Sequence, residues 1–151
     1  MKKTLITIGI IVVLIGIVAF SIFQYNKYKE KSVTDILTNL DYNAVDSIIA
    51  RARDLDDIKL EYTFENEDKD AIIQSLKNLK LHRTSKKDLP SDSGYLLTTS
   101  TKDDIYILYL NGNGKTIIFT AKDEDVGYYI NYEMDNSDFY NLVDSLIKKE
   151  K

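Results

Sequence analysis

The chain has one histidine, His82, and no cysteine, which limits the nucleophilic and metal chemistry open to it. Zinc and iron–sulfur sites are usually built from cysteine thiolates or from several histidines. His82 lies in a short strand-like segment, where a histidine at the surface or rim is the ordinary case. The sequence therefore predicts no metal site, no cofactor and no thiol nucleophile.

One short motif has the form of a catalytic nucleophile. Ser145-Leu-Ile-Lys148 matches Ser-x-x-Lys of penicillin-binding enzymes, but the partner motifs Ser-Asp-Asn and Lys-Thr-Gly are missing from the sequence. Lys148 has a simpler role, because a cation is favourable at the negative end of a helix. We predict that this motif is not catalytic and that the chain is not an enzyme.

Acidic side chains are the remaining reactive groups. The clusters at 65–70 and 123–125 offer oxygen ligands for Ca²⁺, but neither has the spacing of an EF-hand loop. Turn and helix-start chemistry explains both clusters. The alternative to a non-catalytic role is a small cell-envelope hydrolase, which needs two carboxylates about 5–10 Å apart across a cleft. The candidates for such a pair are Asp103, Asp104, Asp123 and Asp125.

Tyrosine is abundant, with 11 in the chain and no tryptophan. In the segment 105–110 both alternating faces are apolar, which is typical of a strand covered by two layers. The predicted helices cover one face, so the other could present tyrosines to a partner, and tyrosine is favoured at interfaces. The alternative is that tyrosine simply favours strands. The candidate partner-binding residues are Tyr106, Tyr128, Tyr129 and Tyr132.

The elements that position these groups begin with an apolar segment. Residues 4–23 contain no charged side chain, and a helix of about 20 residues spans a bilayer core of about 30 Å. We therefore predict a transmembrane anchor over residues 1–23 whose partner is the lipid bilayer. A secreted form is the alternative, because Ala19-Phe20-Ser21 offers a candidate signal-peptide cleavage site. Lipid attachment is excluded, since it needs a cysteine.

The charge distribution bears on orientation and partners. Basic residues flank the anchor on both sides, so the positive-inside rule does not decide its orientation. Residues 32–151 carry 15 basic and 23 acidic side chains, a net charge of −8. An acidic domain is not attracted to an anionic cytoplasmic leaflet, and it is a poor match for nucleic acid. We predict a single-pass protein of the cell membrane with a cytoplasmic N-terminus and an extracytoplasmic domain.

The rest of the chain predicts an α+β fold. We expect a juxtamembrane stalk or helix over residues 24–43, including a helix over 33–40 capped by Ser32, and a globular domain over residues 44–151. In that domain a mostly antiparallel sheet of four to six strands packs against helices at 67–79 and 137–148. Asn111–Gly114 predicts a tight hairpin. The strand segments are 58–64, 95–101, 105–110, 116–121 and 127–132. Residues 81–84 are a candidate short strand, and 45–53 is readable as strand or helix.

The run Val45-Asp-Ser-Ile-Ile, followed by 58–64, Asp70–Leu79 and Gly94-Tyr95-Leu96, resembles small membrane- or lipid-anchored surface proteins of low-GC Gram-positive bacteria. The similarity covers most of residues 42–132 and is a pattern of strands around a helix. It implies a strand at 45–53 and an outward-facing domain, and it carries over no catalytic residue. Many such relatives carry a lipid-attachment cysteine, which this chain lacks. The anchor, the lack of a reactive constellation and the candidate tyrosine face lead us to expect a non-catalytic binding or accessory module, sensor-like or immunity-type, with a protein partner at the membrane.

Overall fold

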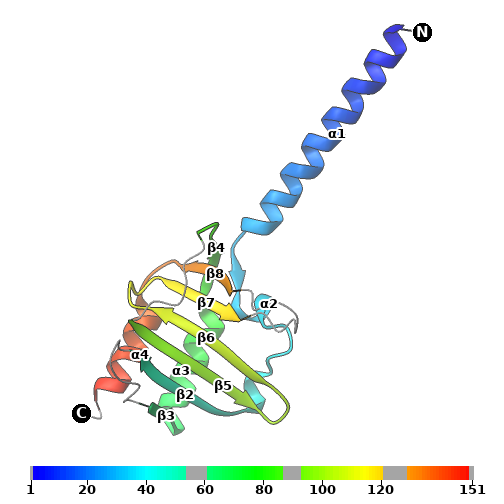
Figure 1. Ribbon diagram of the computed structural model, residues 1–151. Coiled ribbons are helices and arrows are strands. Elements are labelled where there is room, and N and C mark those ends of the chain that lie inside the picture. The colour runs from blue at the N-terminus through cyan, green and yellow to red at the C-terminus, as the bar shows by residue number, and fades with distance from the viewer. Residues whose placement is uncertain (1, 54–60, 87–92, 121–128, 150–151) are drawn as a thin grey trace.

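The computed structural model describes residues 2–53, 61–86, 93–120 and 129–149. The first helix, α1 (Lys2–Tyr28), projects away from the rest of the molecule (Figure 1). Its apolar stretch, within Ile6–Tyr28, has a mean hydropathy of 2.9, and none of that stretch is buried against the domain. Such a helix is compatible with a single-pass membrane anchor, and a signal sequence has the same features.

The described strands form one sheet in which every neighbouring pair is antiparallel. Its order is β1-β4-β8-β7-β6-β5-β2-β3. The strands are β1 (Lys31–Ser32), β2 (Val45–Arg53), β3 (Glu61–Phe64), β4 (Lys80–Arg83), β5 (Gly94–Thr101), β6 (Ile105–Asn111), β7 (Thr116–Thr120) and β8 (Tyr129–Met134). The predicted α+β class is confirmed. The sheet has eight strands instead of four to six, in part because the two-residue β1 is too short to show a period in the sequence.

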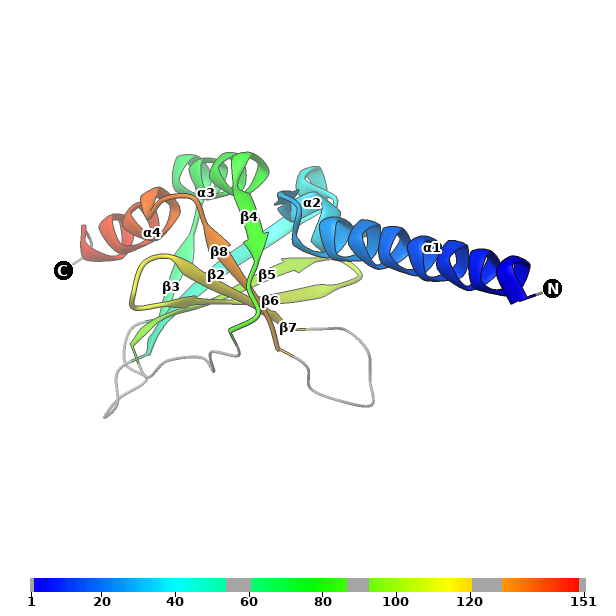
Figure 2. The same cartoon turned by 90° about the horizontal axis from the view of Figure 1, so that it is seen from above.

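Helices cover one face of this sheet, as Figure 2 shows. α3 (Asn66–Asn78) follows β3 at one edge and leads to β4 near the opposite edge, so it crosses the whole sheet. α4 (Asp138–Lys148) packs beside α3, and the short α2 (Val33–Ile36) lies on the same side. The other face of the sheet carries no described helix.

The hydrophobic core lies between the sheet and these helices. In an antiparallel pair, directly opposed residues point to the same face. Ala50, Leu97 and Leu108 oppose one another across β2, β5 and β6, and all three are buried. The other large buried core side chains include Phe64, Phe119, Ile72, Leu76, Phe139 and Val143.

The segment after α1 packs onto the domain. Ser32 caps α2 through a capping box, in which its hydroxyl accepts from the Asp35 N–H and the Asp35 carboxylate accepts from the Ser32 N–H. α2 ends at Ile36, earlier than the predicted 33–40 helix, because the chain turns there and buries Leu40. Val33 and Leu40 both belong to the core, so this part of the expected juxtamembrane segment contacts the sheet.

Most local predictions in the described residues are confirmed. β2 is a strand, which decides the ambiguity over 45–53, and α4 begins directly after Ser137. The turn after β6 is tight, with the Gly114 N–H bonded to the Asn111 carbonyl at 2.9 Å and a φ of +71° at Gly114. The parts of the predicted strands at 58–60, 121 and 127–128 lie outside the described residues.

Candidate functional site

An apolar pocket of about 300 Å³ opens where β6 begins and β7 ends, beside α2. α2 contributes Ile36, and Leu37 follows at its C-terminal end. Ile105 and Tyr106 come from the start of β6. The remaining apolar lining comes from Ile107, Phe119 and Ile130. The pocket therefore joins the segment that follows α1 to one end of the sheet.

Ile105 marks the rim of this pocket. It is 64% exposed, and among the residues whose burial is described it is the one exposed large apolar side chain outside α1. The edge of β6 places it there, because Ile105 is the first residue of the strand and follows the exposed turn residues Lys102 and Asp103. A single exposed isoleucine is ordinary on a protein surface. Beside an apolar pocket, Ile105 enlarges the continuous apolar area that is open to contact.

The pocket lies close to the point where the chain leaves α1. Only Lys29 and Glu30 separate the end of α1 from β1, and α2 begins directly after β1. In Figures 1 and 2, α2 lies near the domain end of α1. If α1 spans a membrane, the pocket lies within reach of the membrane surface, because Ile36 follows Tyr28 by only eight residues, at most about 29 Å of extended chain.

The structure describes the burial of two of the four predicted partner-binding tyrosines. Tyr106 and Tyr132 are 8% and 3% exposed, and both belong to the core on the helix-covered face, not to the uncovered face where we expected them. Tyr106 alternates in phase with the core residue Leu108, which fixes its face. Tyr106 still lines the apolar pocket. Tyr128 and the side chain of Tyr129 lie outside the described residues, so binding of a partner by this set stays a prediction.

The candidate carboxylate pairs are only partly described. Asp104 takes part in the turn between β5 and β6, where its carbonyl accepts from the Thr101 N–H at 2.8 Å and its N–H donates to the Thr101 hydroxyl at 3.0 Å. Asp103 is exposed in the same turn, and Asp123 and Asp125 lie outside the described residues. No described cleft joins two of these four acids.

The Ser-x-x-Lys motif forms contacts within α4. The Ser145 hydroxyl donates to the Leu142 carbonyl at 2.8 Å, and the Lys148 ammonium pairs with Asp144 at 2.8 Å. The hydrogen bond to Asp144 raises the pKa of Lys148 above its usual value. A lysine that holds its proton more tightly is a poorer general base, which fits the helix-end role expected from the sequence.

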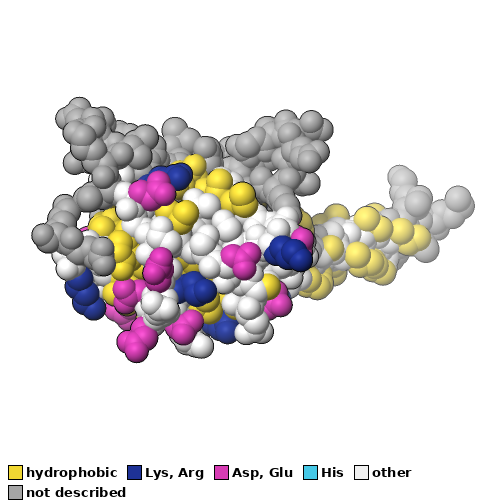
Figure 3. All heavy atoms as spheres, turned by 90° about the horizontal axis from the view of Figure 1, so that it is seen from below, with side chains coloured by type: hydrophobic (Ala, Val, Ile, Leu, Met, Phe, Trp, Pro, Cys, Tyr) yellow, Lys and Arg dark blue, Asp and Glu magenta, His cyan; other side chains and the backbone are white. Residues whose placement is uncertain are grey.

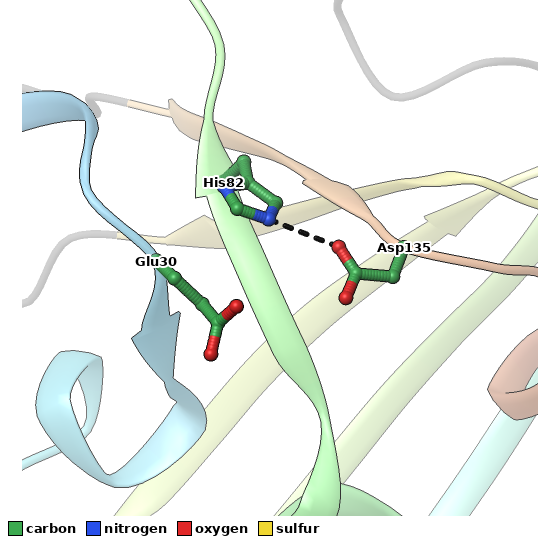
Figure 4. Close-up of side chains that lie close together, drawn as sticks. All are labelled: Glu30, His82 and Asp135. Carbon is green, nitrogen blue, oxygen red and sulfur yellow. Dashed lines mark ion pairs between the residues drawn. The ribbon is translucent and has the colours of Figure 1, made fainter.

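A second cluster combines residues that are far apart in the chain. Glu30, His82 and Asp135 bring their ligand atoms within 4.8 Å of one another (Figure 4). Sequence reasoning set His82 aside because it is the single histidine, and no spacing motif links it to the two carboxylates. Strand pairing supplies the link, since β4 lies between β1 and β8.

Comparisons with family models, with curated proteins and with solved structures give no significant match for this chain.

Proposed function

We propose that this chain is a single-pass protein of the cell membrane whose extracytoplasmic domain is a non-catalytic binding module for a protein partner in the same membrane. The observation that carries the proposal is the apolar pocket beside α2, with the exposed Ile105 at its rim, a few residues after the apolar helix α1. A fixed anchor raises the effective concentration of such a site for partners in the same bilayer.

The length and exposure of α1 support insertion in a membrane. The stretch Ile6–Tyr28 has 23 residues, which as a helix extends about 35 Å and exceeds a hydrocarbon core of about 30 Å. Its large apolar side chains are between 50% and 63% exposed from Ile6 to Phe23. In water that surface is unfavourable, because each buried methylene is worth about 0.8 kcal/mol.

The proposed extracytoplasmic orientation rests on the negative charge of the domain and on its resemblance to bacterial surface proteins. The acidic domain has no attraction to an anionic inner leaflet, and long domains are exported largely regardless of their charge. The resemblance to surface proteins of Gram-positive bacteria favours the same side. The lack of cysteine is consistent with a bacterial surface domain that depends on its core and not on disulfides.

The pocket favours a protein over a small ligand. A volume of about 300 Å³ lies at the lower end of the range for small-molecule pockets, roughly 300–1,000 Å³. One or two apolar side chains of a partner fill such a space, which is the geometry of an interface hot spot. Thr38, Asn39 and Thr120 line the same pocket and offer polar contacts around the apolar centre.

The experiment that tests this proposal is site-specific crosslinking in intact cells. A photoreactive residue replaces Ile105, and a matched variant carries it at Thr63, an exposed position on β3 at the far edge of the sheet. We expect a defined membrane-protein adduct from position 105 and none from position 63. The adduct should disappear when Ile36→Asp is added. Adducts with lipid alone, or equal adducts from both positions, contradict the proposal of a protein partner.

The membrane assignment has its own test. We expect the full-length chain to stay in carbonate-washed membranes and its domain to be removed by protease added to intact cells. A shorter soluble form indicates signal-peptide cleavage instead, and protection from the protease places the domain inside the cell. Co-purification of the same partner, and its loss in Tyr106→Ala, checks whether the pocket tyrosine takes part. Because Tyr106 is buried, the unfolding of that variant is measured in parallel.

A further inference from the structure

We propose that Glu30, His82 and Asp135 form a binding site for Zn²⁺ that joins the exit of the anchor helix to the sheet. Figure 4 shows the three side chains directed toward one another from the start of β1, from β4 and from the end of β8. The His82 imidazole Nε2 already lies 2.9 Å from the Asp135 carboxylate.

The strand register explains why these side chains meet. Lys80 pairs with Ser32 on β1, and Leu81 pairs with Met134 on β8. Extending the antiparallel register sets Glu30 opposite His82 on one side, and sets Asp135 diagonal to His82 on the other. His82 is thus flanked by a carboxylate from each neighbouring strand. Glu30 directly precedes β1 and Asp135 directly follows β8, so the pairing of these strands with β4 holds both carboxylates close to His82.

The donor set fits zinc better than the hard cations. One imidazole nitrogen and two carboxylate oxygens, with water in the fourth position, is a coordination that Zn²⁺ accepts at about 2.0–2.2 Å per bond. Calcium and magnesium prefer oxygen ligands alone. Ligands of a tetrahedral zinc ion are about 3.4 Å apart, so donors now within 4.8 Å need only small side-chain rotations to close on the ion.

The three side chains have room to move onto an ion. The three side chains are about half exposed, at 48%, 47% and 46%, and therefore have room to rotate and space for a bound water. The Lys80 ammonium pairs with Glu30 at 3.2 Å and is the competing cation. An exposed ion pair such as Lys80–Glu30 contributes little stability. A divalent ion that also binds His82 and Asp135 therefore displaces Lys80 from Glu30.

The test is zinc binding to the full-length chain in detergent micelles, measured by equilibrium dialysis. We expect one Zn²⁺ per chain, at least tenfold weaker binding in His82→Gln, Asp135→Asn and Glu30→Gln, and tighter binding in Lys80→Gln. Glu65→Gln, which removes an exposed acid at the far end of the sheet, is the matched control and should bind as the wild type does. Mg²⁺ at the same concentration should not compete.

A second readout reports on the site itself. Because His82 is the single histidine, a nitrogen-15 spectrum of the imidazole contains one residue, and we expect zinc to shift its Nε2 signal. The ion should also raise the unfolding temperature of the wild type and not that of Glu30→Gln, since a ligand of the folded state stabilises it. Zinc binding that persists in His82→Gln, or an Nε2 signal that zinc leaves unchanged, overturns the proposal.

Discussion

The hydroxyl of Tyr95 on β5 donates a hydrogen bond to the carboxylate of Asp144 on α4, and the other oxygen of that carboxylate pairs with Lys148. Burial, followed by the hydrogen bond to Asp144, holds the pKa of Tyr95 well above its usual value. The hydrogen bonds from Lys148 and Tyr95 hold the pKa of Asp144 below its usual value. One carboxylate therefore attaches the C-terminal helix to the middle of the sheet.

Removing the Tyr95 hydroxyl tests that attachment. We expect Tyr95→Phe to lower the free energy of unfolding by about 1.5 kcal/mol, because a hydrogen bond to a charged group contributes about 1.5–3 kcal/mol. Urea unfolding followed by circular dichroism gives the value. Lys148→Gln breaks only an exposed contact and should cost clearly less. An equal loss in the two variants would mean that the exposed charge pair contributes as much as the Tyr95 hydroxyl does, which contradicts this prediction.

The same carboxylate predicts a dependence on pH. Since the pKa of Asp144 is lower in the folded state than its ordinary value of about 3.9, its stabilising effect is complete above that value and is lost as the pH falls through the folded-state pKa. Urea unfolding of Asp144→Asn should therefore depend less on pH than that of the wild type between about pH 5 and pH 2. Asp46→Asn, at an exposed position on β2, serves as control and should follow the wild type.

Gly94 at the start of β5 should not tolerate a side chain. Its φ is +122°, and an added Cβ would lie 2.0 Å from the Leu110 carbonyl oxygen. We expect Gly94→Ala to lower the free energy of unfolding by about 3 kcal/mol or more, since backbone strain and a clash with a paired strand add. Gly16→Ala, where an added Cβ meets no atom within 4 Å, should leave domain unfolding unchanged. A folded Gly94→Ala protein of wild-type stability would show that this register is wrong.

Substitution of Thr99 should raise the free energy of unfolding instead of lowering it. It is 1% exposed on the helix-covered face, and its hydroxyl has no hydrogen-bond partner among the described residues. Thr99→Val keeps the shape and removes the buried hydroxyl, so we expect the free energy of unfolding to rise by about 1 kcal/mol. Thr98→Val, at a half-buried position on the uncovered face, is the matched control and should change stability little. A loss in Thr99→Val would indicate a hidden partner for the hydroxyl.

The sequence predicts the fold well where periodicity or turn chemistry acts locally. The Ser32 cap and the Asn111–Gly114 hairpin each depend on residues close together in the chain. Periodicity alone left 45–53 open between strand and helix, and the structure has a strand there. The face of the sheet that each side chain occupies was harder to predict, because a strand such as β6 is apolar on both sides. The prediction that Tyr106 points away from the helices was therefore not supported by its burial.

The candidate sites depend on long-range pairing, which sequence spacing does not encode. The pocket brings α2 beside the first residues of β6, and the cluster brings Glu30 beside His82 and Asp135. The sequence indicated Tyr106 as a partner contact but not the pocket that it lines, because Ile105 reads as an ordinary strand residue. The single histidine reads as isolated. Only the order of strands in the sheet, with β4 between β1 and β8, makes the second cluster visible.

The way the chain enters the sheet has a mechanical consequence. β1 pairs with β4 over two residues and follows α1 after two more, so a force that pulls α1 away from the domain acts first on that pair. The pulling force reaches the long inner strands only after β1 has detached. Figure 3 shows the molecule from below, with acidic, basic and apolar side chains interspersed over the domain and the apolar α1 extending to one side. The weakest connection under tension is therefore beside α1, where a bound ion would stiffen it.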